Sequence, residues 1–307
     1  MAYFSADVAA LPRANVLGVG VHAIHMRMAI EAIEADILQR RRGYVCLTGV
    51  HGVMEAQRNP DLMGIFSMAT LVLPDGMPTV WMGHLQGFRE MDRVFGPDLM
   101  IAMAERSILM GHSHFLCGGQ VGVAEQLRDT LLCRFPTIRV LGTYTPPFRP
   151  LRRDEERTLI STVQDLAPDI IWVGMSTPKQ ERFMAEYLPR LNTTLMIGVG
   201  AAFDFHTGRV KDSPQWVKRS GLQWAHRLIQ QPARLWRRYI INNPLFLVRA
   251  GLQLTGVKRH YLKLDGSSPH SGLLVAQTSI APLVNSSFLR FPYDYCKYCC
   301  AQAQGVP

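Results

Sequence analysis

Short apolar runs alternate with longer amphipathic stretches over the first two hundred residues of the chain. Apolar runs of four to six residues are typical of strands in a parallel sheet, and a three- to four-residue apolar spacing is typical of helices. The pattern predicts strands at 16–21, 44–48, 71–74, 114–117, 138–141, 170–174 and 195–199. It predicts helices near 25–41, 53–67, 97–109, 120–134, 152–166 and 178–190. This alternation indicates an α/β fold with a mostly parallel, Rossmann-like sheet and helices on both faces.

The pattern changes after the last predicted strand. Pro214, Pro232 and Pro244 divide the following segment into short predicted helices, each starting near its proline. Beyond about residue 265 the composition turns to Ser, Pro and Gln without periodicity, which predicts a disordered tail. We therefore expect three regions: an α/β domain at 1–206, a helical appendage at 207–263 and a disordered tail at 264–307.

Positive charge is concentrated in the predicted helical appendage. Residues 207–263 hold 12 Lys and Arg against one acid, Asp212, whereas residues 1–206 hold 19 Lys and Arg against 21 Asp and Glu. Aromatic residues run through the basic segment, at Trp216, Trp224, Trp236, Tyr239 and Phe246. Such a segment suits an anionic membrane surface or the bases of a nucleic acid. A solvated basic face over an aromatic core stripe is the structural alternative.

Composition narrows the class of protein. With 307 residues, of which 48% are hydrophobic and 19% charged, the chain is expected to form a globular core. The first residues contain no basic region followed by an apolar run, and the uncharged stretch 266–289 is too rich in Ser, Pro, Gly and Asn for a membrane span. The six cysteines form no disulfide framework, and the C-terminal cluster of Cys296, Cys299 and Cys300 is a weak candidate for zinc because no second ligand pair lies at a suitable spacing. We expect a cytoplasmic protein with peripheral membrane contact, no metal and no cofactor.

Two predicted strand ends carry residues suited to a ligand site. Asp75 follows the strand at 71–74 and is well placed to act as a general base, although Asp-Gly is also simply a good turn. Gly118 and Gly119 lead from a strand into a helix, where the backbone can approach a phosphate. A tight turn without a ligand explains these glycines equally well.

Two further strand ends are also polar. Lys179, Gln180 and Glu181 follow a strand and a helix cap, and they are more polar than capping requires. Asp204 follows the last predicted strand. Because the carboxyl ends of parallel strands lie at one edge of a sheet, these side chains are candidates for binding sugar hydroxyls or phosphate.

Missing motifs also restrict the chemistry. The chain has no Asp-x-Asp motif, which is the usual carboxylate pair for a metal bound to a nucleotide diphosphate. It also has neither a nucleophile elbow nor a His-Glu-x-x-His pair. Arg93 is a candidate to replace a metal at a leaving diphosphate, although an ordinary surface arginine is the simpler interpretation.

The order of these motifs resembles the WecG/TagA/CpsF glycosyltransferase family. Seven separated blocks over roughly residues 15 to 250 agree in order and approximate spacing: Thr48, Pro74-Asp75-Gly76, Arg93-Val94-Phe95-Gly96-Pro97-Asp98-Leu99, Gly118-Gly119, Pro178-Lys179-Gln180-Glu181, Gly198-Val199-Gly200-Ala201-Ala202-Phe203-Asp204, and Gly221-Leu222-Gln223-Trp224-Ala225-His226-Arg227-Leu228 with Pro232-Ala233-Arg234.

The resemblance implies a hexosyltransferase that moves a sugar, with inversion, from a UDP-sugar donor to a lipid-linked saccharide acceptor at the cytoplasmic membrane face. It implies that Asp75 deprotonates the acceptor hydroxyl, that Arg93 assists the leaving diphosphate and that Gln180 lines the pocket. Thr48, Gly118, Gly119, Lys179 and Asp204 are the accompanying candidates for substrate binding. The resemblance also implies that Arg227, Arg234 and Arg237 of the appendage complete the site at an anionic membrane surface.

The chain departs from the family pattern at one point. Many members have Thr-x-Asn after the second strand, whereas here Thr48 is followed by Gly49 and Val50. The asparagine is lost, so the donor sugar stays open among N-acetylmannosamine, its uronic acid, glucose and other hexoses. His51 is a candidate to replace the lost polar contact, although a single histidine near such a turn is more often structural.

The principal hypothesis is a membrane-associated glycosyltransferase of exopolysaccharide or cell-envelope polymer synthesis, for which a homo-oligomer is possible. The alternative from another class is a nucleic-acid-binding protein that uses the basic aromatic segment. We expect no nucleic-acid partner, because no nucleic-acid-binding motif is present. Gel shifts compared with liposome sedimentation separate these two hypotheses. An inactive nucleotide-sugar sensor is disfavoured because Asp75, Arg93 and Gln180 are all retained.

Overall fold

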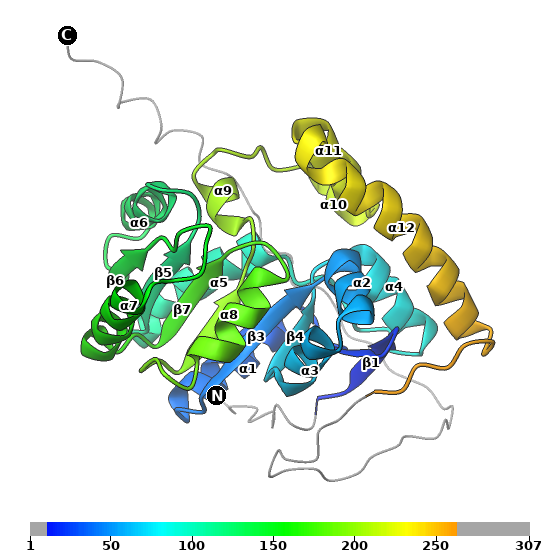
Figure 1. Cartoon of the computed structure of the whole chain (residues 1–307), viewed down its shortest axis with the longest axis horizontal. Coiled ribbons are helices and arrows are strands. Elements are labelled where there is room, and N and C mark those ends of the chain that lie inside the picture. Colours follow the sequence, from blue (N-terminus) through cyan, green and yellow to red (C-terminus); the bar gives the residue numbers. More distant parts are fainter. Residues whose placement is uncertain (1–10, 263–307) are drawn as a thin grey trace. The chain divides into compact units, whose positions relative to one another are not determined.

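A six-stranded sheet forms the centre of the protein. The structure, a computed structural model, describes residues 11–262. Neighbouring strands of the sheet are all parallel, in the order β4-β3-β8-β7-β5-β6 (Figure 1). These strands are β3 (Gly43–Thr48), β4 (Leu71–Pro74), β5 (Ser113–Gly118), β6 (Arg139–Tyr144), β7 (Ile170–Gly174) and β8 (Leu195–Gly198). The predicted α/β fold with a mostly parallel sheet is confirmed.

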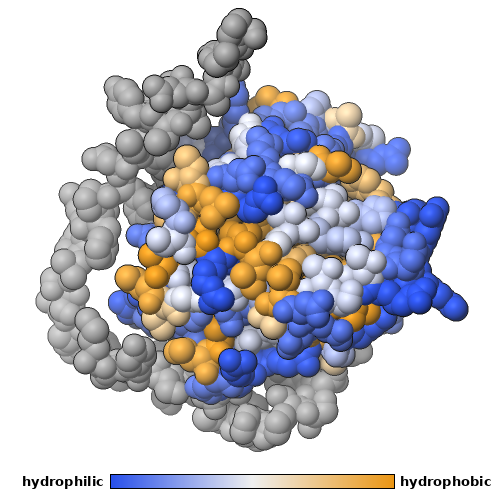
Figure 2. All heavy atoms as spheres, turned by 90° about the vertical axis from the view of Figure 1, so that its left-hand side faces the viewer, coloured by the Kyte–Doolittle hydropathy of each residue, from blue (hydrophilic) through white to orange (hydrophobic). Residues whose placement is uncertain are grey.

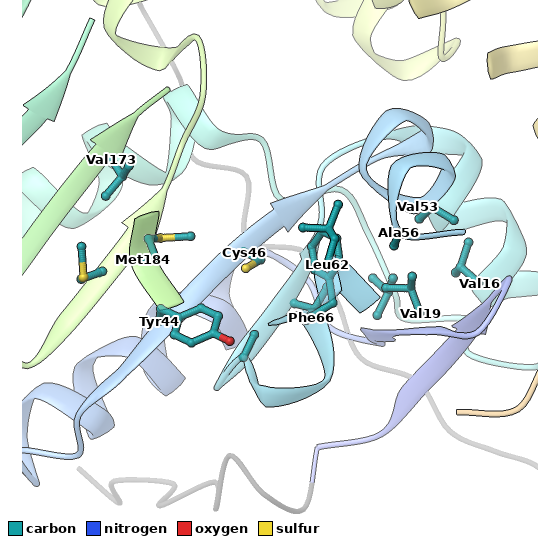
Figure 3. Packing of buried hydrophobic residues seen from close by; sticks show 14 of the residues in the cluster. Val16, Val19, Tyr44, Cys46, Val53, Ala56, Leu62, Phe66, Val173 and Met184 are labelled. Atoms are coloured by element: carbon teal, nitrogen blue, oxygen red, sulfur yellow. The ribbon is translucent and has the colours of Figure 1, made fainter. Parts of the chain in front are cut away.

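Helices cover both faces of the sheet because its strands are apolar on both sides. In β3, Val45 and Leu47 pack into one buried cluster, and Tyr44 and Cys46 pack into the other. The first cluster includes α1 (Met26–Leu38), α5 (Gly96–Met110) and α6 (Val123–Arg134). The second includes α2 (Val50–Arg58), α3 (Pro60–Met68), α4 (Met77–Leu85), α7 (Arg153–Leu166) and α8 (Lys179–Tyr187). Figure 3 shows part of the second cluster, where Leu62 and Phe66 lie beside Cys46.

The prediction of a single strand at 16–21 is wrong. This segment belongs to a separate antiparallel hairpin of β1 (Arg13–Val16) and β2 (Val19–His22). Leu17 and Gly18 form its turn with positive φ angles of 52° and 86°. A leucine in the left-handed conformation is uncommon, so the continuous apolar run gave no sign of a turn.

The hairpin protects one edge of the sheet. The buried ring of His22 places its Nδ1 atom 2.9 Å from the backbone nitrogen of Val72 in β4, and Arg13 Nε donates to His22 Nε2 at 3.1 Å. The edge strand thus finds a side-chain partner for its backbone, which keeps the edge from pairing with another chain. The opposite edge of the sheet is β6, and the face of the molecule on that side carries both hydrophobic and hydrophilic side chains (Figures 1 and 2).

The predicted helix at 53–67 is two helices, α2 and α3. Asn59 ends α2 and caps α3, since its side chain accepts hydrogen bonds from the backbone nitrogens of Asp61 and Leu62 at 3.0 and 3.2 Å. Pro60 occupies the first position of α3, where its missing N–H costs nothing. Asn59 and Pro60 therefore mark the boundary between α2 and α3, which the apolar spacing of this segment did not indicate.

Between the end of β8 and residue 262 the chain forms four helices: α9 (Ala202–His206), α10 (Gln215–Arg219), α11 (Gln223–Gln230) and α12 (Pro232–Leu254). The predicted division at Pro244 is wrong, because this proline lies inside the continuous helix α12. Apolar packing on both sides of Pro244 offsets its lost hydrogen bond, since Tyr239 and Phe246 are both buried. The predicted disordered tail and the C-terminal cysteine cluster lie outside the described residues.

Helix α12 shares a core with the α/β body. Phe246 and Ala250 belong to the same buried cluster as α2 and the hairpin. The side-chain amide of Gln253 also accepts from Leu17 N at 2.9 Å and donates to Asn15 O at 2.8 Å. Between residues 11 and 262, none of the helices is both long and apolar enough to cross a membrane.

Replacing Phe246 by alanine is expected to destabilise the whole protein. Its side chain is 2% exposed, and truncating a buried phenylalanine typically costs about 3–5 kcal/mol. The matched control is Leu247→Ala, because Leu247 is 63% exposed and its truncation should change the free energy of unfolding by less than about 1 kcal/mol. Urea denaturation measures both. If the two substitutions lowered the free energy of unfolding equally, α12 would be only loosely packed against the α/β body.

Candidate active site

A cleft of about 1490 Å³ lies at the carboxyl ends of the strands. The loops that follow β3, β4, β5, β6, β7 and β8 line one side of it, and residues of α11 and α12 line the other. Figure 1 shows α11 and α12 beyond these strand ends. The fold therefore gathers the predicted strand-end residues and the basic appendage around one space, as expected for a parallel α/β sheet.

Most of the predicted site residues line this cleft. They are Thr48, Asp75, Arg93, Gly119, Lys179, Gln180, Asp204, Arg227 and Arg234. Gly118 and Arg237 do not line it. A Cβ atom on Gly118 would lie 2.5 Å from the carbonyl oxygen of Gly174, so this glycine permits close contact between strands. The exposed Arg237 instead lies 5.2 Å from the ring centre of Trp236.

Asp75 and Arg93 lie together at the β4 end of the cleft. The backbone nitrogen of Asp75 donates to Thr48 O at 2.9 Å, which fixes the residue beside β3. Arg93 Nε donates to the backbone oxygen of Asp75 at 2.5 Å, and Arg93 Nη2 lies 3.8 Å from Asp75 Oδ1. The side chain of Asp75 is 38% exposed, whereas Oδ1 is buried without a hydrogen-bond partner among the described residues. The exposed part of the side chain lies in the wall of the cleft, where a ligand can contact the carboxylate.

The ring of Phe95 and a side chain of α11 hold Arg93 in place. Its guanidinium lies 4.2 Å from the ring centre of Phe95 and donates a hydrogen bond to Gln223 Oε1. The Arg93 side chain is only 12% exposed. Such a fixed cation can stabilise negative charge without rearranging first.

Two further cations surround the same aromatic rings. Phe95 packs edge-to-face against Phe205 at 5.7 Å, and Arg227 lies 5.6 Å from the centre of the Phe205 ring. Lys218 lies 5.0 Å from the Phe95 ring, but its Nζ atom is also 2.5 Å from the Asp212 carboxylate. Arg93 and Arg227 are therefore the cations of this cluster that are best able to meet an anionic ligand.

Gln180 organises the wall of the cleft. Its Oε1 atom accepts from Gly200 N at 3.0 Å, and its Nε2 atom donates to Glu181 Oε1 at 3.0 Å. Thr177 Oγ1 donates to the same Glu181 oxygen at 2.9 Å. Gln180 is 2% exposed and Glu181 is fully buried, and this burial raises the pKa of the Glu181 carboxyl. The amide of Gln180 thus joins the first turn of α8 to the loop that follows β8.

Arg238 lines the cleft but was missed by the sequence analysis, which selected its neighbour Arg237. The sequence signal for Arg238 was its position around the axis of α12. Leu235, Tyr239 and Asn242 are buried on one side of this helix, and Arg238 lies three residues after the first and four before the third. Helical spacing therefore turns Arg238 toward the body and Arg237 toward solvent.

His51, which also lines the cleft, joins α2 to α12. Asn242 Nδ2 lies 3.1 Å from His51 Nδ1, and Arg58 Nη2 donates to Asn242 Oδ1 at 2.7 Å. Burial, aided by the nearby Arg238 and Arg58 charges, lowers the pKa of His51 to about 3, despite a hydrogen bond with the Thr177 backbone. The ring is therefore neutral at physiological pH and links two helices.

Comparison with known proteins places this chain among glycosyltransferases. The chain belongs to the glycosyl transferase WecG/TagA/CpsF family, whose model matches residues 14–260. One relative is the N-acetylglucosaminyldiphosphoundecaprenol N-acetyl-beta-D-mannosaminyltransferase of Bacillus spizizenii strain W23, which is 27% identical over 212 residues. The enzyme of the same name from Bacillus subtilis strain 168 is 27% identical over 213 residues. Each alignment covers 69% of this chain and 80% of the relative.

The half-buried, neutral His51 predicts a loss of stability in acid. Because its pKa is lowered from 6.5 to about 3 on folding, the unfolded chain binds a proton between these pH values that the folded chain excludes. The free energy of unfolding should fall as the pH decreases from 6.5 toward 3, with no contribution from this group above 6.5. His51→Gln removes this titration, so its urea midpoint should change less between pH 7 and 4.5 than that of the wild type. Equal changes of the urea midpoint with pH in the two proteins would contradict the lowered pKa of His51.

Proposed function

We propose that this protein is an inverting glycosyltransferase that transfers a hexose-type sugar from a UDP-sugar to a polyprenyl-diphosphate-linked saccharide. The observation that carries the proposal is the Asp75–Arg93 pair, which places a proton acceptor beside a fixed cation in a large cleft. The names of the relatives favour N-acetylmannosamine as the donor sugar and an N-acetylglucosaminyl diphosphate lipid as the acceptor. The product belongs to exopolysaccharide or cell-envelope polymer synthesis.

The proposed reaction is a single displacement at the anomeric carbon of the donor. Asp75 takes the proton of the acceptor hydroxyl while that oxygen forms a bond to the anomeric carbon from the face opposite the diphosphate. The bond between the anomeric carbon and the diphosphate oxygen breaks, and UDP leaves with the bonding electrons. Arg93 and Arg227 stabilise the negative charge that develops on UDP. Attack from the opposite face accounts for inversion.

The appendage supports the lipid-linked part of the proposal. Its sequence holds 12 Lys and Arg residues against one acid, and its exposed side chains include those of Arg237, Trp216 and Trp236. Such a surface is suited to an anionic membrane, where each basic residue contributes on the order of 1 kcal/mol. We therefore propose peripheral attachment to the cytoplasmic face of the membrane. Neither the family nor the relatives support the nucleic-acid-binding alternative.

A donor screen tests the function directly. Purified protein is incubated with an acceptor that carries N-acetylglucosamine on a lipid diphosphate, and UDP release is measured with UDP-N-acetylmannosamine, its uronic acid, UDP-glucose and other UDP-hexoses. We expect one donor to support acceptor-dependent release. If no donor released UDP and the protein bound no UDP, the proposal would fail.

Asp75→Asn is expected to reduce kcat about 100- to 10,000-fold, because the amide keeps the shape of the carboxylate but cannot take up the proton. Binding of UDP should be nearly unchanged. The control is Asp165→Asn at an exposed carboxylate of α7, which should keep wild-type turnover. Initial rates at saturating donor give the comparison, and near-normal turnover by Asp75→Asn would rule out this base.

Arg93→Ala is expected to reduce kcat about 100- to 1,000-fold, the effect of removing one group that stabilises transition-state charge. Arg93→Lys should recover only part of the rate, because lysine cannot reproduce the planar fork of arginine. Turnover of the wild type should continue in the presence of EDTA. A strict requirement for Mg²⁺ or Mn²⁺ together with a nearly silent Arg93→Ala would contradict this role.

A further inference from the structure

Gln223, the first residue of α11, lines the active-site cleft beside Arg93 and is 8% exposed. Its Oε1 atom accepts a hydrogen bond from Arg93 Nη2. Its Nε2 atom is buried without a hydrogen-bond partner in the part of the chain that the structure describes. A buried amide donor without a partner lowers stability, and an apolar side chain of the same size would avoid this cost. The one hydrogen bond of the Gln223 side chain between residues 11 and 262 thus goes to Arg93.

This contact helps to fix one edge of the Arg93 guanidinium. Arg93 Nε donates to the backbone oxygen of Asp75 at 2.5 Å, and Nη2 donates to Gln223 Oε1. Because Nε and Nη2 lie on the same edge of the planar group, the end that carries Nη1 has no hydrogen-bond partner within residues 11–262. This free end is the part of Arg93 that can meet the diphosphate of the donor.

Gln223 holds Arg93 without removing its charge. An amide oxygen accepts a hydrogen bond from a guanidinium but carries no net charge itself, whereas a carboxylate at this position would form an ion pair. The ring of Phe95, 4.2 Å from the guanidinium, restricts Arg93 further. The cation is therefore oriented before a ligand arrives, and Gln223 leaves its positive charge for that ligand.

Gly221 lets the start of α11 approach the α/β body closely. Its φ angle is 73°, and a Cβ atom at this position would lie 2.8 Å from Trp81 Cη2 and 3.2 Å from Met77 Cβ. Trp81 and Met77 both belong to α4. Any larger residue at 221 would displace the chain two residues before Gln223. The glycine therefore permits the approach that brings Gln223 to Arg93.

We propose that Gln223 is a positioning residue for the transfer reaction, which acts through Arg93, and that Gly221 seats it against α4. Gln223 holds the guanidinium so that its Nη1 end faces the diphosphate of the donor. No bond to Gln223 forms or breaks during the transfer. This inference rests on the proposed function and deepens it by naming the group that orients the cation at the leaving UDP.

Gln223→Met tests the assignment, because methionine has nearly the same length and lacks the amide. With the donor and acceptor that support UDP release, kcat should fall about 10- to 100-fold, the loss expected when one hydrogen bond to a charged group is removed. The melting temperature should be no lower than that of the wild type, because the substitution also removes the unpaired Nε2 donor. The matched control is Gln164→Met at an exposed glutamine of α7, which should keep the wild-type kcat.

Combination with Arg93→Ala shows whether Gln223 acts through Arg93. When two groups act as a unit, the second substitution costs little after the first. Gln223→Met should therefore lower kcat by less than about threefold in the Arg93→Ala background. An equal loss in both backgrounds would show that Gln223 supports the fold or contacts the substrate by itself, and it would overturn the proposal.

Two further variants test the acceptor oxygen and the seat. Gln223→Glu keeps an oxygen acceptor for Arg93 but adds a negative charge, so its kcat should lie between those of the wild type and Gln223→Met. Gly221→Ala should lower kcat. Gly256→Ala should not, because Gly256 has a similar φ of 74° but an added Cβ atom there meets no other part of the described chain within 4 Å. If Gln223→Glu were as slow as Gln223→Met, or if both glycine variants kept the same kcat, the proposal would be contradicted.

The outcomes separate this inference from the proposed function. If the wild type released no UDP with any donor, or if Arg93→Ala kept the wild-type kcat, the role of Arg93 would fail and the inference would fail with it. If Arg93→Ala lost activity and Gln223→Met kept it, the inference alone would fail. A raised KM for the donor with an unchanged kcat in Gln223→Met would make Gln223 a donor-binding residue and overturn its positioning role.

Discussion

The packing of α12 against α2 and the β1–β2 hairpin is the interaction on which the site depends. Phe246 and Ala250 are buried in the same cluster as α2 and the hairpin, and Gln253 binds backbone groups of the hairpin. This contact fixes the side of the cleft opposite the strand ends. The basic segment is thereby part of the folded body, even though its charge sets it apart in the sequence. A parallel sheet alone would present Asp75 and Gln180 on an open edge.

Buried polar groups give the cleft its shape. Gln180 joins the first turn of α8 to the loop after β8, whereas His51 and Asn242 join α2 to α12. Hydrogen bonds are directional, and a buried polar group without a partner is costly. These contacts therefore specify one geometry where apolar packing alone would allow several. The loops therefore reach the cleft in fixed positions, which pre-organises the site for charged ligands.

The strands of the sheet could be predicted well because a strand buried on both faces is a continuous apolar run. The predicted strand at 71–74 and the predicted strand at 170–174 match β4 and β7 residue for residue. Predictions failed where a single residue overrode the pattern, as Leu17 did in the hairpin turn and Asn59 between two helices. They failed again at Pro244, where tertiary packing outweighs local preference.

For the site, the sequence located the strand-end residues but could not assign the arginines of α12. Thr48, Asp75 and Gln180 lie at the carboxyl ends of parallel strands and line the same cleft. An alternation of strands and helices in the sequence already predicts this arrangement. The choice between Arg237 and Arg238 depends on the rotation of α12 about its axis. That rotation is set by contacts nearly 200 residues apart in the sequence, such as Asn242 with His51.

The position of α12 also determines when the cleft is completed during synthesis of the chain. The hairpin and α2 leave the ribosome early, but the helix that covers them ends at Leu254. Until that helix emerges, Val16, Leu17 and Val53 have no α12 to pack against, and the cleft lacks one of its sides. A nascent chain of this protein therefore carries uncovered apolar surface for most of its translation, as is typical of folds that depend on distant contacts. The delay also means that a prematurely terminated chain has no completed site with which to consume substrate.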